Sequence, residues 1–251
     1  MILAVDIGNT TIQFAFVDKV KVKRLQSIDA CLPVSELKKS LRSLCRIFKR
    51  QKQITECVIC SVVPKISGSV KRVLRKELAW DVFIIGDDIK VPMEIDYRPK
   101  TAVGQDRLVG AFAAKEIYGT PSIIIDLGTA ITFDMVSECG VYDGGIIIPG
   151  IRLSAESLFN KTALLPNIDA IKAPKTLVGK STKESILSGL FNGYGTMCSG
   201  LIDQLKVKKY KNARIVVTGG HVQLMKKYIS SRINKIDEDL VFKGLYLLQR
   251  N

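Results

Sequence analysis

The pattern of apolar and polar positions predicts strands and helices that alternate along the chain. Short runs dominated by Ile, Val, Leu and Ala, such as 2–6 and 122–126, are typical of buried strands. In the segment 33–49, apolar side chains instead recur every three or four positions and so line one face of a helix. The residues of that face are Leu37, Leu41, Leu44 and Phe48. The alternation predicts an α/β protein.

The order of predicted elements is the same in both halves of the chain. The first half has predicted strands at 2–6, 11–17 and 20–25, a helix at 33–49, a strand at 57–63, a helix at 70–78, a strand at 82–85 and a helix at 106–118. The second half has predicted strands at 122–126, 130–137 and 140–148, helices at 151–159 and 182–206, a strand at 214–218, and helices at 222–230 and 239–249. This repeat predicts a duplicated fold with domains at 1–116 and 117–251 and a cleft between them.

Composition and length are those of a globular protein with one large domain or two small ones. Hydrophobic residues make up 47% of the 251 positions and charged residues 25%. No apolar run reaches the ~20 residues that a membrane span requires. Met1 leads directly into a predicted strand, without the basic region and cleavage site of a signal peptide. We therefore expect a cytoplasmic protein with no membrane partner.

The formal net charge of +14 has two interpretations. Basic residues cluster at 19–24, 38–52, 71–76, 206–214 and 226–235. They could form a nucleic-acid-binding surface, or they could cover the solvent-exposed faces of helices. We favour the second interpretation, because neither interleaved aromatic residues nor a recognised nucleic-acid-binding module accompanies the charge.

The six cysteines indicate neither a disulfide framework nor a zinc site. Cys57 and Cys60 form a Cys-x-x-Cys pair, but they lie inside an apolar run that predicts a strand. Residues three apart on a strand point to opposite faces, so the two thiols would not converge on a metal. No second pair completes a zinc site, and we expect reduced, structural cysteines.

Two segments about half a chain apart share one arrangement of residues. Asp6-Ile7-Gly8-Asn9-Thr10 and Asp126-Leu127-Gly128-Thr129-Ala130 each follow an apolar strand and precede a second β-rich strand. Glycine lets backbone N–H groups approach phosphate oxygens, threonine adds a hydroxyl donor, and an aspartate before the turn can hold a hydrated cation. The repeat predicts two lobes, each with a phosphate-binding hairpin, and a nucleotide between them.

The segment Gly104-Gln105-Asp106-Arg107 opens a predicted helix, where unpaired N–H groups and the positive end of the helix dipole favour anions. Asp106 could cap this helix, with Arg107 as a solvated partner. In a functional site, Asp106 is instead suited to accept the proton of a substrate hydroxyl, and Arg107 to bind a substrate carboxylate. The residues alone leave both interpretations open.

The segment Thr218-Gly219-Gly220, between a predicted strand and a predicted helix, also has two interpretations. Its glycines would let a flat ring approach the backbone, but a simple strand-to-helix turn is also consistent with them. We expect His221, which follows it, to be structural or exposed rather than catalytic.

Taken in order along the chain, these motifs resemble those of type III pantothenate kinase. The resemblance includes both hairpin motifs, Tyr97-Arg98-Pro99, Gly104-Gln105-Asp106-Arg107, Gly144-Gly145, Pro149-Gly150, Gly179-Lys180-Ser181-Thr182, Ser188-Gly189 and Thr218-Gly219-Gly220. The family belongs to the superfamily of acetate and sugar kinases, Hsp70 and actin. The resemblance therefore implies two duplicated ribonuclease-H-like lobes with a nucleotide cleft between them.

The resemblance also implies an activity, which is ATP-dependent phosphorylation of pantothenate to 4′-phosphopantothenate, the first step of coenzyme A synthesis. It implies that Asp106 is the catalytic base and that Asp6 faces the magnesium of ATP. Asp126 would bind a monovalent cation, either potassium or ammonium. Because the family is typically a cytoplasmic homodimer, a partner subunit would help to close the substrate site.

The remaining implied contacts fall into two groups. Residues that would bind ATP are Asp6, Ile7, Gly8, Asn9, Thr10, Thr11, Ile12, Gln13, Thr129, Gly219 and Gly220. Residues that would bind pantothenate are Tyr97, Gly104, Gln105, Asp106, Arg107 and Thr182. Two alternatives stay open. One is a superfamily kinase for another small hydroxyl compound, and the other is a non-enzymatic regulatory factor that binds nucleic acid.

Overall fold

A computed structural model describes residues 1–250, which form two compact units. Unit 1 comprises Met1–Ile117 together with the chain from Asp239 onward, and unit 2 comprises Tyr118–Glu238. The first break between units lies beside the expected boundary at 116/117. The grouping differs at the end of the chain, because the last helix packs on the sheet of unit 1 rather than within the second half.

Unit 1 contains six strands, with helices between and after them. Its elements are β1 (Ile2–Ile7), β2 (Thr11–Asp18), β3 (Lys21–Arg24), β4 (Ile28–Asp29), α1 (Val34–Phe48), β5 (Glu56–Ser61), α2 (Pro64–Leu78), β6 (Asp81–Ile84), the short 3-10 helix η1 (Lys100–Ala102), α3 (Gln105–Tyr118) and α7 (Leu240–Arg250). The sheet order is β3-β2-β1-β5-β6, with β4 paired to β2. The meander β1-β2-β3 is antiparallel, while β5 and β6 add in parallel.

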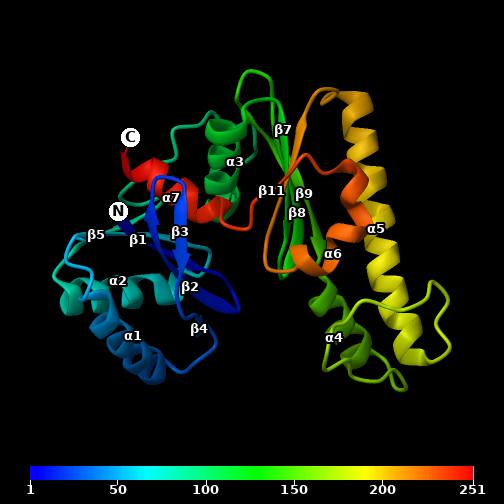
Figure 1. Cartoon of the computed structure of the whole chain (residues 1–251), viewed down its shortest axis with the longest axis horizontal. Helices are drawn as coiled ribbons and strands as arrows, with labels where there is room; N and C mark the ends of the chain where they lie inside the picture. Colours follow the sequence, from blue (N-terminus) through cyan, green and yellow to red (C-terminus); the bar gives the residue numbers. More distant parts are fainter. Residues whose placement is uncertain (251) are drawn as a thin grey trace. The chain divides into compact units, whose positions relative to one another are not determined.

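Helices cover both faces of this sheet (Figure 1). The apolar faces of α1 and α2 pack on one face, where Leu41, Phe48 and Cys57 belong to one buried cluster. On the other face, α7 and part of α3 pack over a second cluster that includes Cys60. Cys57 and Cys60 therefore lie on opposite faces, which confirms that they do not converge on a metal.

Helix α2 begins earlier than the apolar pattern predicts. The expected start was residue 70, whereas the observed helix starts at Pro64. Proline suits the first helical position, because its fixed φ fits a helix and its missing N–H would have had no partner there. The two-residue strands β4 and β11 (Lys235–Ile236) were not predicted, since so short a segment has no readable period.

Unit 2 repeats the strand order of unit 1. Its elements are β7 (Ser122–Leu127), β8 (Ala130–Val136), β9 (Tyr142–Pro149), α4 (Ile151–Lys161), α5 (Thr182–Lys208), β10 (Arg214–Thr218), α6 (Val222–Ile229), η2 (Ser230–Arg232) and β11. The sheet order β9-β8-β7-β10-β11 matches β3-β2-β1-β5-β6, including the antiparallel meander and the parallel additions. The predicted duplication is thus present at the level of topology.

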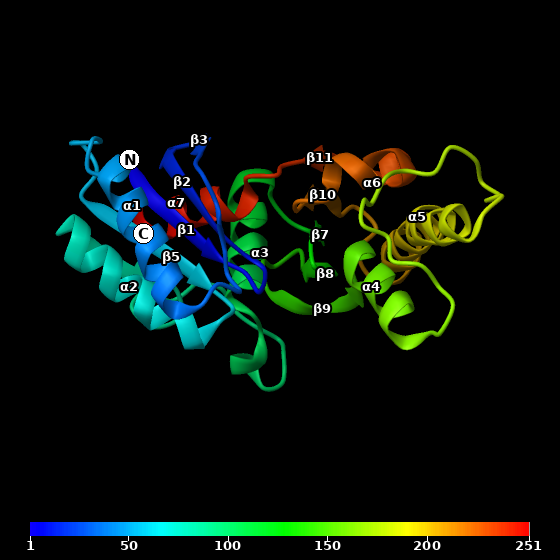
Figure 2. The same cartoon turned by 90° about the horizontal axis from the view of Figure 1, so that it is seen from below.

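Helices α5 and α6 lie on the same face of the unit 2 sheet (Figures 1 and 2). Phe191 and Ile202 of α5 and Met225 of α6 are buried against Phe133 of the sheet. In the described part of the chain, no helix is long and apolar enough to cross a membrane.

The contact between α3 and α7 within unit 1 depends on a glycine. A Cβ added at Gly244 would lie 2.7 Å from Val109 Cγ1 and 2.9 Å from Val109 O. Those distances are shorter than real Cβ contacts, so a side chain would push the helices apart.

We predict that Gly244→Ala destabilises the protein by about 1–3 kcal/mol, the usual range for overpacking. Gly68→Ala is the matched control, because Gly68 is exposed in α2 and a Cβ there meets nothing within 4 Å. That control should gain about 0.5–1 kcal/mol from helix propensity. Urea unfolding of both variants measures the difference, and a neutral or stabilising Gly244→Ala would show that the α3–α7 contact is loose.

Candidate active site

The turn between β1 and β2 is tight, and its tip is exposed. Gly8 donates its N–H to the Thr11 carbonyl at 3.0 Å, and Asn9 and Thr10 lie at the exposed tip. A Cβ added at Gly8 would lie 3.4 Å from Thr11 O, an ordinary van der Waals distance. The fold of this hairpin therefore tolerates a side chain at position 8.

The equivalent turn in unit 2, between β7 and β8, is enclosed by other segments of the same unit. Gly150 donates its N–H to Thr129 O at 3.0 Å, and a Cβ at Gly150 would lie 2.4 Å from that oxygen. From the other side, the backbone N–H of His221 is donated to Leu127 O at 2.8 Å. The His221 ring also contacts Gly128 O, with Nδ1 at 3.2 Å. These contacts are consistent with the expectation that His221 is structural rather than catalytic.

Gly219 makes room for the Asp126 carboxylate. Its φ of +102° is in the region that favours glycine, and an added Cβ would lie 2.2 Å from Asp126 Oδ1. Thr132 of β8 and Thr218 of β10 are the cross-strand neighbours of Asp126. Neighbouring residues on adjacent strands point to the same face, so a carboxylate and two hydroxyl groups share one face of this sheet.

Asp106 lies inside helix α3, which begins at Gln105, so it is not the residue that caps the helix. Its Oδ1 accepts the backbone N–H of Arg107 at 2.8 Å. A Cβ at Gly104 would lie 2.5 Å from the same oxygen, so glycine at 104 allows the carboxylate to turn back over the start of the helix. The local geometry thus fixes where the Asp106 carboxylate points.

Asp6 and Asp106 form a like-charge pair within unit 1. The pKa of Asp6 is raised to about 7, chiefly by burial and then by the charge of Asp106, while the charge of Arg24 lowers it. Burial also raises the pKa of Asp106, against the backbone N–H and the charge of Arg107. Cys60, the β5 neighbour of Asp6, has its thiol pKa raised by burial and then by the two carboxylates. Mutual repulsion of two carboxylates is typical of a site that binds a cation or transfers a proton.

Arg24 is a charged residue near Asp6 that the sequence did not indicate as part of the site. Its Nε donates to Asp239 Oδ1 at 2.7 Å, and its Nη1 donates to Gln13 Oε1 at 3.2 Å. In the sequence, Arg24 is one of a run of basic residues on a short strand, which is typical of a solvated edge. Strand alternation could have found it, because Arg24 pairs with Ala15, two positions from Gln13.

The other predicted substrate residues lie at exposed or half-buried positions. Tyr97 is half-buried in the loop before η1, and Gln105 lies beside Gly86. Thr182 is exposed at the first turn of α5. Its helix is capped by Ser181, whose hydroxyl accepts the Glu184 N–H at 3.3 Å. Within unit 1 the structure brings together Asp6, Gln13 and Asp106, and within unit 2 it brings together Asp126, Thr129 and Gly219.

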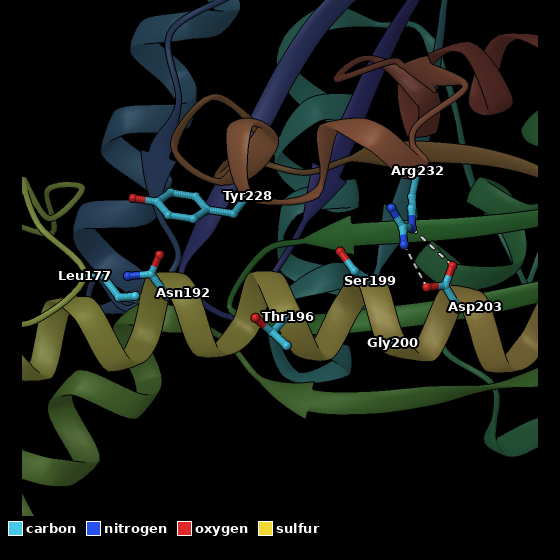
Figure 3. Close-up of a pocket in the computed structure, with 8 residues that line it drawn as sticks. All are labelled: Leu177, Asn192, Thr196, Ser199, Gly200, Asp203, Tyr228 and Arg232. Atoms are coloured by element: carbon cyan, nitrogen blue, oxygen red, sulfur yellow. Dashed lines mark hydrogen bonds and ion pairs between the residues drawn. The ribbon is translucent and has the colours of Figure 1, made fainter.

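A separate pocket of about 490 Å³ lies in unit 2 between α5 and the α6–η2 segment (Figure 3). Its lining residues are Leu177, Asn192, Thr196, Ser199, Gly200, Asp203, Tyr228 and Arg232. Arg232 forms two hydrogen bonds with Asp203, at 3.1 and 2.9 Å. None of the predicted site residues lines this pocket, so it is not the candidate active site.

The family model described as type III pantothenate kinase matches residues 2–204. This chain belongs to the type III pantothenate kinase family. A type III pantothenate kinase of Persephonella marina is 39% identical over 251 residues, covering 98% of this chain and 97% of the relative. One from Halalkalibacterium halodurans is 36% identical over 253 residues, covering 100% and 99%. The resemblance seen in the sequence is confirmed.

Solved structures of low identity share the fold of this pantothenate kinase family member. A Campylobacter jejuni protein described as belonging to the Baf family of transcriptional activators has a TM-score of 0.61 at 18% identity, with 99% of this chain and 97% of that chain covered. A ROK family glucokinase from Streptomyces griseus has a TM-score of 0.58 at 11% identity, with 99% of each chain covered. At such identities the likeness concerns the fold alone, and it confirms the predicted α/β fold with two duplicated units.

We predict that Asp6→Asn stabilises the ligand-free protein at pH 8 but not at pH 4. In wild type, the unfolded state ionises Asp6 near pH 3.8 and the folded state only near 7, so stability falls as pH rises between these values. Replacing the carboxylate removes a penalty of about 4 kcal/mol at pH 8. Chemical unfolding at both pH values measures this, with exposed Asp87→Asn as control. An equal effect of Asp6→Asn at both pH values would contradict the raised pKa of Asp6.

Proposed function

We propose that this chain transfers the γ-phosphoryl group of ATP to the primary hydroxyl of pantothenate, giving 4′-phosphopantothenate for coenzyme A synthesis. Membership of the type III pantothenate kinase family supports the reaction. The observation in the structure that carries the proposal is the Asp6–Asp106 pair, which joins the strand before the open hairpin to the start of α3. One carboxylate on the metal side and one acting as base are the parts that phosphoryl transfer needs.

The β1–β2 hairpin would hold the ATP phosphates. Its exposed tip presents backbone N–H groups and the hydroxyl of Thr10. Because the fold tolerates a Cβ at Gly8, the advantage of glycine there would be close approach of phosphate oxygens. Thr129 and the Gly219–Gly220 turn of unit 2 are proposed to contact the nucleotide as well.

The donor set around Asp6 suits magnesium. Hard carboxylate oxygens are the ligands that Mg²⁺ prefers, and Mg²⁺ is commonly bound through one or two carboxylates together with substrate phosphates. Among the described residues no cluster of three or more His, Cys, Asp or Glu side chains could hold a metal by itself, which fits that arrangement. When bound, the ion would offset phosphate charge, and Asp6 would hold it from the β1 side.

Asp106 would act as the general base. Its raised pKa brings its proton affinity closer to working pH, which favours transfer of the hydroxyl proton. The Arg107 N–H occupies Oδ1, so Oδ2 is the oxygen suited to accept that proton. The Arg107 guanidinium would bind the carboxylate of pantothenate. The other proposed pantothenate contacts are Tyr97, Gly104, Gln105 and Thr182.

Asp126 is proposed to bind a monovalent cation, either potassium or ammonium. The carboxylate of Asp126 and the hydroxyls of Thr132 and Thr218 lie on one face of the sheet, and oxygen donors of this kind suit a hard cation. The room that Gly219 leaves for Asp126 Oδ1 is consistent with this role.

We also propose a homodimer and a cytoplasmic location. Several large apolar side chains of unit 2 are exposed along one stretch of chain. They are Ile147, Leu153, Phe159, Leu164, Leu177 and Val178. Exposed apolar residues concentrated in this way are typical of a protein–protein interface, and a second copy of the chain is the partner that the family resemblance implies.

The activity assay combines purified protein, Mg·ATP and pantothenate, with and without potassium or ammonium. Formation of phosphopantothenate, followed by ³¹P NMR, supports the proposal. A panel of other small hydroxyl compounds tests the first alternative, and turnover of one of them in place of pantothenate would establish it. Absence of phosphopantothenate under every cation condition would overturn the proposed function.

We predict that Asp106→Asn lowers kcat about 10²–10⁴-fold, the usual contribution of general-base help. Asparagine can still accept the Arg107 N–H, so the thermal melt should stay near that of wild type. Steady-state kinetics and a melt of the same sample check this. A near wild-type kcat in a folded variant would assign the base elsewhere.

A further inference from the structure

Arg24 lies on the same face of the unit 1 sheet as Asp6, the carboxylate proposed to face the magnesium of ATP. Asp6 pairs with Gln13 across β1 and β2, and Arg24 pairs with Ala15 across β2 and β3. Gln13 and Ala15 are two positions apart on one strand, so they point to the same face. The three polar side chains Asp6, Gln13 and Arg24 therefore extend across three adjacent strands.

The guanidinium of Arg24 is held by contacts from three directions. Nε donates to Asp239 Oδ1 at 2.7 Å, and Nη1 donates to Gln13 Oε1 at 3.2 Å. The ring of Phe242 lies beneath it, with Cζ 5.5 Å from the ring centroid. The side chain is nevertheless 43% exposed, so part of the guanidinium is accessible to a ligand. A charged group held in this way is preorganised rather than free to move.

The contact with Gln13 determines how its amide is oriented. Guanidinium groups only donate hydrogen bonds, so the amide oxygen of Gln13 must face Arg24. The amide NH₂ group is then turned away from Arg24 and is available as a donor. Gln13 belongs to the segment proposed to bind ATP phosphates, so a fixed amide donor and a fixed positive charge lie together beside that segment.

The charge of Arg24 also reaches Asp6, because it lowers the pKa of that carboxylate against the effects of burial and Asp106. A purely structural interpretation would make Arg24 a surface link between β3 and the start of α7 through Asp239. Such a link explains the ion pair with Asp239. It does not require the contact with Gln13 or the influence on Asp6.

We propose that Arg24 is a positioning residue for the polyphosphate of the nucleotide, orienting the Gln13 amide and supplying a fixed positive charge beside the β1–β2 hairpin. This inference rests on the proposed function, since it assumes that the hairpin binds nucleotide phosphates. Its ligand chemistry is that of a nucleoside di- or triphosphate, and a nucleoside without phosphates should not depend on Arg24.

The test measures binding of Mg·ADP and of adenosine by titration calorimetry. Arg24→Gln should weaken Mg·ADP binding about 10-fold or more, as expected for loss of a charged hydrogen-bonding group, and leave adenosine binding unchanged. In turnover, KM for ATP should rise while KM for pantothenate stays the same. Arg24→Lys, which restores the charge without the planar fork, should recover only part of the loss.

Two variants separate this role from a structural one. Asp239→Asn removes the charge that pairs with Arg24 but keeps Arg24 itself, so it should weaken Mg·ADP binding less than Arg24→Gln does. Arg42 of α1 forms an exposed ion pair with Glu77 of α2. Arg42→Gln removes a positive charge from this pair, as Arg24→Gln does from its own, and it should leave Mg·ADP binding unchanged. The losses of Mg·ADP affinity caused by Arg24→Gln and by Gln13→Ala should not add up in the double variant. Each substitution removes the same contact between the two side chains.

The outcomes are distinct. Wild-type affinity of Arg24→Gln for Mg·ADP would overturn the inference, and so would equal losses for Mg·ADP and adenosine. An effect of Asp239→Asn as large as that of Arg24→Gln would show a structural link instead. Wild-type protein that binds no Mg·ADP would overturn the proposed function itself, whatever the variants do.

Discussion

Repulsion between two carboxylates, Asp6 and Asp106, is the interaction on which the proposed chemistry depends. Folding places both groups where burial disfavours their charged forms, and the charge of Asp106 makes ionisation of Asp6 harder still. Such an arrangement opposes stability in the ligand-free protein. It becomes favourable when positive charge is supplied, and the magnesium of Mg·ATP would supply that charge. This arrangement is therefore consistent with the proposed binding of Mg·ATP.

The surrounding fold keeps this pair in place. Asp6 lies one residue before the end of β1, whose other residues are all buried, and Asp106 is fixed by the absence of a side chain at Gly104 and by the N–H of Arg107. Helix α7 contributes from the far end of the chain, since Asp239 just before it holds Arg24 near Asp6. Residues distant in sequence thus set the electrostatics of one carboxylate.

The two hairpins share a topology but differ in their surroundings. The tip of the β1–β2 turn is exposed, and its glycine is not required by the fold. The β7–β8 turn is enclosed by Gly150 and the Gly219–His221 segment, where added side chains at Gly150 and Gly219 would collide with the hairpin. The repeated topology therefore contains one open turn, which is proposed to bind phosphates, and one enclosed turn beside Asp126.

Much of the fold and of the candidate site could be predicted from the sequence, because strand runs, helical periods and glycine motifs are local signals. The duplicated topology and the family followed from their order. Arg24 was missed because its partners Gln13 and Asp239 come from two other segments, and a basic residue on a short strand looks solvated. The early start of α2 at Pro64 was missed because its first turn lacks a clear apolar period.

Direct titration of the Asp6 side-chain carboxyl by ¹³C NMR, in ligand-free protein, tests the account most directly. We predict a transition near pH 7 that moves lower in Asp106→Asn. A transition near 4 in wild type, unaffected by Asp106→Asn, would contradict it.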